Sequence, residues 1–295
     1  MPRLRIATRG SPLALAQAEL VAAALGGAEI APVRSDAPAP NDKARFVRGV
    51  EAALLSGEAD LGVHSAKDLP ADEAEGLELV GVPPREEPAD AYVGPATSVA
   101  GIALGARIGT SSLRRRAQLR ALREDLDPVE LRGNVDTRLR KLAAGECDGA
   151  VLALAGLRRL GRDAEVAFAF AIEHMTPAAG QGALAIQARS GDRLAAEAAA
   201  SITERAALVE LTAERAAVSA FGATCNTPIG ICARLASGQL AVTGFAGLAD
   251  GSEWVRDGVA GDPAQPAALG EALAERMLAA GAGELLARAE EEAVA

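Results

Sequence analysis

The clearest structural signal in the sequence is Arg5-Ile6-Ala7-Thr8-Arg9-Gly10-Ser11-Pro12. Its apolar centre predicts a short strand, after which the serine can cap, and the proline can begin, an apolar helix that runs to about Leu25. Nearly the same pattern returns as Arg107-Ile108-Gly109-Thr110-Ser111-Ser112-Leu113, where a strand again meets a serine cap before an arginine-bearing helix. The repetition predicts two related α/β domains.

Other strand candidates lie at 61–64, 130–131 and 150–153, and each is followed closely by a turn or a helical pattern. This alternation predicts largely parallel sheets. Ligands of open α/β sheets bind beyond the carboxyl ends of the strands, where the helices begin. Polar residues that would gather in a cleft at this edge are Arg9, Ser11, Lys67, Asp68, Ser111, Ser112, Arg132 and Arg159.

The last third of the chain has a different pattern. A helix is predicted over 212–221, with Gly222 as its C-terminal cap. Strand-like runs follow at 229–235, 240–248 and 254–259, and a further helix begins at about Pro266. This order of elements predicts a small α+β domain.

A cysteine stands in the loop that opens this domain, Ala223-Thr224-Cys225-Asn226-Thr227-Pro228. An accessible thiol between a helix end and a strand can hold a ligand. The commoner role of a free cysteine is that of a small buried hydrophobe, and this is the role we expect for Cys147 and Cys232. From the residues alone, both roles stay open for Cys225.

A basic cluster occupies 107–141 of an otherwise acidic chain. The 295 residues carry a formal net charge of -10, and 49% of them are hydrophobic, which is ample for two or three domains. That charge repels nucleic acid and anionic membranes, so neither is an expected partner, and the cluster suits a small polyanion. Its cations are Arg107, Arg114, Arg115, Arg116, Arg120, Arg123, Arg132, Arg138, Arg140 and Lys141.

The sequence has no pattern typical of secretion, membrane insertion or metal binding. Residues 1–11 lack the charged region and apolar run of a secretory signal, and no apolar stretch approaches the roughly 20 residues of a membrane span. The three cysteines fit neither a disulfide framework nor a metal-ligand spacing, and the two histidines stand far apart. We expect a cytoplasmic protein without a bound metal.

Two further features bear on chemistry, and each has an ordinary alternative. Asp68, in His64-Ser65-Ala66-Lys67-Asp68-Leu69-Pro70, can exchange a proton at a strand end. A surface ion pair or a turn cap is the commoner role for such an aspartate. The serines at the two helix entries, Ser11 and the pair Ser111 and Ser112, can bind an anion or simply cap the helices.

Five blocks of sequence, taken in order, carry a family resemblance. They are Arg5-Ile6-Ala7-Thr8-Arg9-Gly10-Ser11-Pro12-Leu13-Ala14, His64-Ser65-Ala66-Lys67-Asp68-Leu69-Pro70, Gly109-Thr110-Ser111-Ser112-Leu113-Arg114-Arg115, Leu131-Arg132-Gly133-Asn134-Val135 and Pro177-Ala178-Ala179-Gly180-Gln181-Gly182. The chain resembles the hydroxymethylbilane synthases, also called porphobilinogen deaminases. The similarity covers essentially the whole chain, and several independent blocks in the right order are far more specific than one motif.

The resemblance implies an enzyme of tetrapyrrole biosynthesis that condenses four porphobilinogen molecules head to tail, with loss of ammonia, into linear hydroxymethylbilane. It also implies a covalent dipyrromethane cofactor, joined by a thioether to Cys225. Asp68 matches the family's catalytic aspartate, which helps the amine leave and stabilises the cationic azafulvene. Residues that match cofactor or substrate positions are Arg9, Ser11, Lys43, Phe46, Lys67, Thr110, Ser111, Ser112, Arg114, Arg115, Arg132, Gly133, Asn134, Arg138, Arg159 and Gln181.

The same resemblance implies an architecture and a set of partners. It implies two α/β domains, similar to those of bilobal binding proteins, around a cleft, with a small C-terminal α+β domain. The first domain is expected over 1–82 with a late segment at 183–200, the second over 88–176 and the third over 205–295. It further implies a monomer whose partners are porphobilinogen and the growing polypyrrole.

Two departures from the family pattern lie near expected cofactor positions. The region 34–43 is shorter than the usual loop, and Ala223 and Thr224 stand where paired glycines usually precede the cysteine. Asp68, the arginines and Cys225 are all present, so we expect an active enzyme. Two other interpretations are a bilobal protein that binds a carboxylate without chemistry, and a regulatory or scaffold protein that offers its arginines to an acidic partner.

Overall fold

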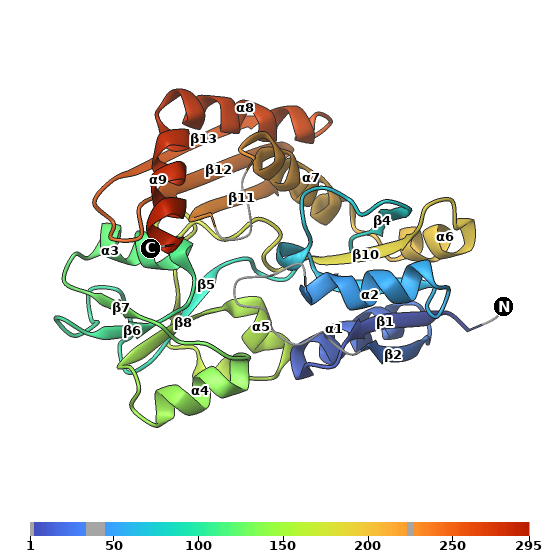
Figure 1. The fold of residues 1–295 in the computed structure, drawn as a ribbon, viewed down its shortest axis with the longest axis horizontal. Helices are drawn as coiled ribbons and strands as arrows, with labels where there is room; N and C mark the ends of the chain where they lie inside the picture. The colour runs from blue at the N-terminus through green and yellow to red at the C-terminus, as the bar shows by residue number, and fades with distance from the viewer. Residues whose placement is uncertain (1–2, 34–44, 223–226, 295) are drawn as a thin grey trace.

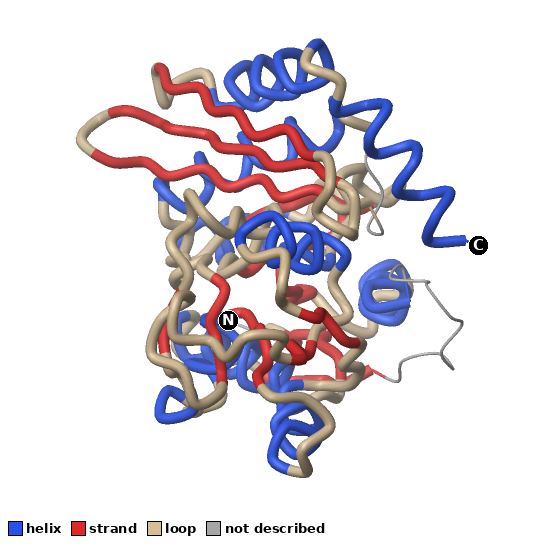
Figure 2. Tube along the Cα trace, turned by 90° about the vertical axis from the view of Figure 1, so that its left-hand side faces the viewer, coloured by secondary structure: helices blue, strands red, loops and turns tan. Residues whose placement is uncertain are grey.

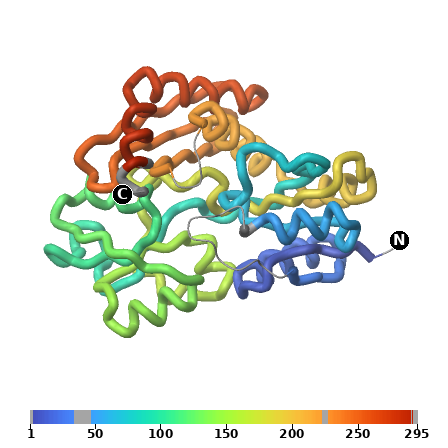
Figure 3. The backbone as a smooth tube through the Cα atoms, viewed as in Figure 1, coloured from blue at the N-terminus to red at the C-terminus, as the bar shows by residue number. Residues whose placement is uncertain are grey.

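The computed structural model describes residues 3–33, 45–222 and 227–294, which form three sheets with helices packed around them (Figure 1). The first sheet has the strand order β2-β1-β3-β10-β4. Its strands are β1 (Arg5–Arg9), β2 (Glu29–Val33), β3 (Leu61–Ser65), β4 (Leu77–Gly81) and β10 (Leu184–Arg189). β1 is parallel to β2 and β3, whereas β10 is antiparallel to β3 and β4. A strand from late in the chain therefore completes a sheet that begins at its start (Figure 3).

Helices cover both faces of this sheet: α1 (Pro12–Ala24) and α6 (Arg193–Ser201) on one, α2 (Arg45–Leu55) on the other. Successive side chains of β1 point to opposite faces, so Ile6 packs with α1 while Ala7 packs with α2. The predicted first helix is confirmed, and Leu25 is its C-terminal cap. A 3-10 turn, η1 (Ala66–Asp68), follows β3.

The second sheet repeats this arrangement with the order β7-β6-β8-β5-β9. Its strands are β5 (Asp90–Val93), β6 (Arg107–Gly109), β7 (Asp127–Val129), β8 (Gly149–Ala153) and β9 (Phe168–Ala169). Again three strands, β7, β6 and β8, are parallel. The next strand in the order, β5, is antiparallel to its neighbours β8 and β9. Its helical elements are α3 (Leu113–Leu122), α4 (Val135–Ala143), α5 (Leu154–Arg159) and η2 (Asp163–Glu165). The predicted repeat is confirmed, because β1 with α1 and β6 with α3 hold equivalent positions.

The strand predicted at 130–131 is wrong, because β7 ends at Val129. The parallel ladder stops there: β6 ends at Gly109, and the Thr110 N–H closes the pairing by donating to the Val129 carbonyl. Pro128 lies within β7 and pairs opposite Ile108. A proline is tolerated in this strand because β7 is at the edge of the sheet, and its presence hid the strand from a reading of the sequence.

The third sheet is antiparallel, with the order β11-β12-β13, and lies beyond the other two (Figure 2). Its strands are β11 (Ile229–Ala236), β12 (Gln239–Gly247) and β13 (Trp254–Gly261), accompanied by α7 (Arg205–Ala220), α8 (Pro266–Ala279) and α9 (Ala282–Val294). The predicted strands and the helix from Pro266 are confirmed. α7 begins earlier than the predicted 212, because its first turns bury Ala207 and Leu211 in an apolar cluster with residues of η1 and β10.

The predicted fold class, two α/β units with a small C-terminal α+β unit, is confirmed. Two segments, 82–89 and 170–183, connect the first sheet to the second. The residue boundaries given above for the three domains stay a prediction. Within the residues described, no helix combines the length and the apolar character needed to cross a bilayer.

Candidate functional site

A pocket of about 660 Å³ opens where the first two sheets and the start of the third come together. Among the residues that line it, the predicted ones are Arg9, Ser11, Lys67, Asp68, Ser111, Ser112, Arg114, Arg115, Arg132, Gly133, Asn134, Arg138, Arg159 and Gln181. Lys43 and Cys225 lie outside the described residues, as does the side chain of Phe46. Thr227, two residues after Cys225 in the sequence, lines the pocket.

Three helices direct their N-termini at this pocket. Ser11 caps α1 by accepting from the Ala14 N–H at 3.3 Å, and Ser112 caps α3 by accepting from the Arg115 N–H at 3.4 Å. Asn134 caps α4 at 2.8 Å in the same way. The capping roles are thus present, and they place the positive ends of three helix dipoles at one cavity.

Thr110 does not line the pocket, although it was predicted to bind ligand. Its side chain is buried, and its hydroxyl accepts from the Ser112 N–H at 3.2 Å. Ser111, the residue between them, donates its hydroxyl to the Leu131 carbonyl at 2.9 Å. Thr110 therefore supports the turn that presents the two serines.

Asp90, which the sequence reading missed, holds the two central arginines in place. Its carboxylate is fully buried and pairs with Arg114 at 2.8 Å and Arg115 at 2.7 Å. Burial alone would raise the pKa of this carboxyl, but the charges of the two arginines hold it well below its usual value. One carboxylate thus fixes two guanidinium groups at the wall of the pocket.

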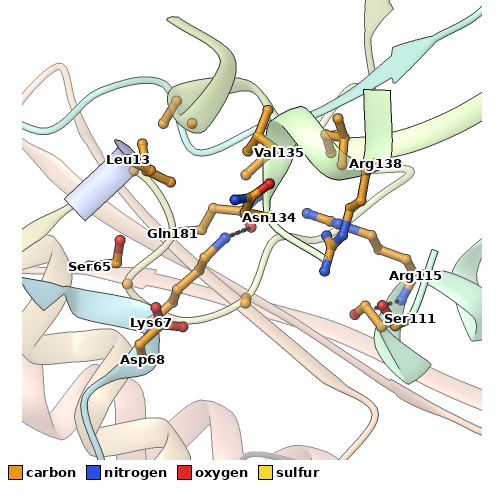
Figure 4. A pocket seen from close by; sticks show the side chains of 18 of the residues that line it. Leu13, Ser65, Lys67, Asp68, Ser111, Arg115, Asn134, Val135, Arg138 and Gln181 are labelled. Atoms are coloured by element: carbon orange, nitrogen blue, oxygen red, sulfur yellow. Dashed lines mark hydrogen bonds between the residues drawn. The ribbon is translucent and has the colours of Figure 1, made fainter. Parts of the chain in front are cut away.

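Gln181 joins this arginine cluster to the turn that carries Asp68. Its amide donates to Asp90 at 2.8 Å and to the Pro88 carbonyl at 2.6 Å, and its oxygen accepts from the Lys67 ammonium at 3.3 Å (Figure 4). Burial lowers the pKa of Lys67 to about 8, and repulsion by Arg115 adds to the effect. An anion bound beside Lys67 would favour its charged form.

Two other cations in the same pocket have lowered pKa values. Burial lowers the pKa of Arg138 to about 10, with a further contribution from the charge of Arg115, whose guanidinium it approaches (Figure 4). Burial likewise lowers the pKa of Arg159 to about 10. Within the described residues, Arg138 Nε is buried without a hydrogen-bond partner. These groups are arranged for negative charge that the described residues do not themselves supply.

The charge balance of the pocket is strongly positive. Its described lining has a single carboxylate, Asp68, against seven cations, which are Arg9, Lys67, Arg114, Arg115, Arg132, Arg138 and Arg159. Asp90 offsets part of this excess from behind the wall, and Glu130 pairs with the exposed Arg132 at 2.6 Å. The remaining positive charge makes the pocket a site for a compound with several carboxylates or phosphates.

The sequence reading also missed Gln17 and Ser65, which line the pocket and hydrogen-bond to each other at 2.8 Å. Gln17 lies on α1 and Ser65 ends β3, so their contact is visible only once both elements are placed. The two glycines that flank Gln181 belong to the sequence block 177–182 that carries the family resemblance. A side chain at Gly180 would meet the Lys67 backbone at 2.8 Å, and one at Gly182 would meet the Glu86 carbonyl at 2.2 Å.

Comparisons with known proteins identify the family. A model described as "Porphobilinogen deaminase, dipyromethane cofactor binding domain" matches residues 4–197, and one for the porphobilinogen deaminase C-terminal domain matches 203–279. The chain is 43% identical to a porphobilinogen deaminase of Roseiflexus castenholzii over 96% of its own length and 98% of the relative's. It is 39% identical to one of Campylobacter concisus over 99% and 100%. The chain therefore belongs to the porphobilinogen deaminase family, the hydroxymethylbilane synthases of tetrapyrrole biosynthesis.

Proposed function

We propose that the pocket is where this hydroxymethylbilane synthase joins four porphobilinogen molecules head to tail. Four ammonia molecules leave and one water enters, which balances the conversion to linear hydroxymethylbilane. The observation that carries the proposal is the excess of cations over carboxylates on the walls of one cavity. Each porphobilinogen brings an acetate and a propionate, so a growing chain supplies the negative charge that these walls lack.

The residues present fit a dipyrromethane cofactor. Two pyrrole units carry four carboxylates, and the buried Arg138 Nε offers a donor without a partner among the described residues. Cys225 is the residue that would hold the cofactor through a thioether, and Thr227, two residues later in the sequence, lines the cavity. When bound, the dipyrromethane would supply the pyrrole carbon from which the chain of new units starts.

Asp68 is the proposed catalytic residue. It ends η1 at the pocket wall beside Lys67, and it is the single carboxylate of the described lining. A carboxylate there can stabilise the positive charge that develops on the incoming pyrrole as its amino group leaves, and can transfer a proton. Lys67, held by Gln181, would bind a substrate carboxylate next to it.

The remaining cations would hold the acetate and propionate groups of the bound units. Arg138 and Arg159 lie inside the pocket, and Arg132 stands exposed at its edge. A hydrogen bond to a charged group contributes roughly 1.5–3 kcal/mol. A few such bonds would dominate the affinity for each unit.

The reaction can be tested by its stoichiometry. Holoenzyme given porphobilinogen should release four ammonia molecules for each tetrapyrrole that leaves the protein. Ammonia is measured by an enzymatic assay and the tetrapyrrole by chromatography. A carboxylate-binding protein would retain porphobilinogen without releasing ammonia, and that result would overturn the proposal.

Replacing Arg138 with leucine should have opposite effects on binding and stability. KM for porphobilinogen should rise about tenfold, because a charge-assisted hydrogen bond is lost. The cofactor-free protein should melt at a higher temperature, because a buried charge and its repulsion by Arg115 are both removed. Steady-state kinetics and calorimetry measure the two effects.

The matched control is Arg140→Leu on the same helix. Arg140 is exposed and lies outside the pocket lining, and its guanidinium donates to the Thr137 hydroxyl at 3.2 Å. Its replacement should leave KM and the melting temperature nearly unchanged. An Arg138→Leu variant that behaves like this control would remove Arg138 from the binding site.

We further propose that the enzyme acts as a monomer in the cytoplasm, on porphobilinogen and the growing polypyrrole alone. The match to the porphobilinogen deaminase family supports the substrate and the product. Two cysteines, Cys147 and Cys232, are buried as free thiols, which is typical of a reducing compartment.

A further inference from the structure

The turn that carries Asp68 rests on α7, a helix of the C-terminal unit. Ala66 and Leu69, on either side of Asp68, are buried in one apolar cluster with Ala207 and Leu211 of α7. Leu69 also closes η1 by donating its N–H to the Ala66 carbonyl at 3.2 Å. The face of the turn away from the pocket is therefore packed against the helix.

Arg215 lies one helical turn after Leu211 and continues this contact with hydrogen bonds. Its two terminal nitrogens donate to the Pro70 carbonyl at 2.8 Å and to the Ala71 carbonyl at 2.7 Å. The planar guanidinium thus binds the carbonyl groups of two successive residues, directly after Asp68-Leu69. A fork of this kind fixes orientation as well as distance, which a single flexible donor does not.

The same helix also holds the other side of the turn. Glu214, next to Arg215, is fully buried and accepts from the Gly180 N–H at 2.6 Å. Gly180 packs so closely on η1 that a side chain there would meet the Lys67 nitrogen at 2.8 Å. The Asp68 turn is therefore enclosed between a connecting segment and α7, and both contacts are anchored on adjacent residues of α7.

We propose that Arg215 is a positioning residue for Asp68. It fixes the chain that follows η1 and so sets where the Asp68 carboxylate stands in the pocket. α7 ends at Ala220, five residues before Cys225 in the sequence, so the helix that anchors the aspartate also leads into the cysteine loop. The proposal rests on the proposed catalytic role of Asp68, and Arg215 itself touches no reacting atom.

Arg215→Met tests the proposal in holoenzyme loaded with preformed tetrapyrrole, with loading verified by intact mass. The methionine keeps much of the packing but removes both donors. kcat should fall about 10- to 100-fold, because small misplacements of a catalytic group have effects of that size. KM should stay within about twofold, since no substrate contact is removed.

Two companion variants show whether the hydrogen bonds are responsible. Arg215→Lys retains one donor nitrogen in place of the two of the guanidinium, and its kcat should lie between those of wild type and Arg215→Met, at unchanged KM. If Arg215→Met does not fold, the lysine variant decides alone: a lowered kcat supports the proposal, and a wild-type kcat overturns it. Arg205→Met, at an exposed position on the same helix, should match wild type.

A double-mutant cycle separates positioning from general structural damage. If Arg215 acts through Asp68, adding Arg215→Met to Asp68→Asn should slow turnover by no more than about twofold. Losses that multiply would overturn the proposal, as would a KM effect without a kcat effect. Wild-type turnover by Asp68→Asn alone would instead contradict the proposed role of Asp68, so the two failures are distinguishable.

Discussion

Replacing Asp68 with asparagine should lower kcat by about 10²- to 10⁴-fold, the range that a positioned acid or base contributes. The substitution keeps the size of the side chain and removes its charge and its ability to exchange a proton. Asp68 is the single carboxylate of the described pocket lining, so no described neighbour there can replace it. Binding should suffer less than turnover, because the cations that hold the substrate carboxylates stay in place.

The measurement requires holoenzyme, since the cofactor is assembled from the same substrate. We would load the Asp68→Asn protein with preformed tetrapyrrole, verify the adduct by intact mass and follow porphobilinogen consumption. Asp72→Asn is the matched control, because Asp72 is exposed on the turn that follows. Equal turnover by Asp68→Asn and wild type would show that the pocket performs its chemistry without this carboxylate.

The local units of the fold could be predicted because their signals are short-range. A serine cap followed by a proline begins α1, and the same kind of cap begins α3, so each strand–turn–helix unit is specified within about a dozen residues. The strands of the C-terminal sheet are likewise separated by turn residues. Such elements depend on neighbouring residues, and the structure confirms them with changes at their ends.

The long-range contacts could not be derived from local patterns. β10 is separated by more than a hundred residues from β3, with which it pairs, and only the family resemblance indicated that a late segment returns to the first domain. No local pattern singled out Asp90 in the sequence. Its role depends on the ion pairs with Arg114 and Arg115 of α3, because a buried carboxylate needs partners of opposite charge.

Only some arginines of the basic cluster at 107–141 line the pocket. The others lie on another helix face or pair with carboxylates outside the pocket. Arg138 enters the pocket while Arg140, on the other face of α4, remains exposed. Arg107 pairs with Asp148, and Arg123 pairs with Asp125, both outside the pocket lining. The sequence indicates that a polyanion site exists, but the selection among its arginines requires the three-dimensional placement of each helix.

Replacing Cys225 with serine should abolish the covalent adduct and reduce turnover to background. Wild-type protein, analysed denatured, should carry the added mass of one dipyrromethane, and peptide mapping should locate that mass on Cys225. A serine hydroxyl is a far weaker nucleophile than a thiol, so the variant should show the mass of the bare chain. A pyrrole-reactive aldehyde reagent should colour wild type alone.

Cys147→Ala and Cys232→Ala are the matched controls, because both thiols are buried, at 3% and 1% exposure, in apolar clusters or strands away from the pocket lining. Both variants should retain the adduct and the activity of whatever fraction folds. An adduct that persists in Cys225→Ser, or that maps to another residue, would contradict the proposed attachment.

The loss of the cofactor should also lower the melting temperature of Cys225→Ser. Burial lowers the pKa values of Lys67 and Arg138, and repulsion by Arg115 adds to the effect, so the cofactor's carboxylates would offset both the burial cost and the repulsion. A bound group that favours the native state stabilises it, and each kcal/mol corresponds to about 2–4 °C in a protein near this size. Added salt should narrow the gap, because it screens the same repulsion in the empty pocket. Equal melting temperatures at low salt would mean that the arginine cluster is held by Asp90 and its protein partners without help from a ligand.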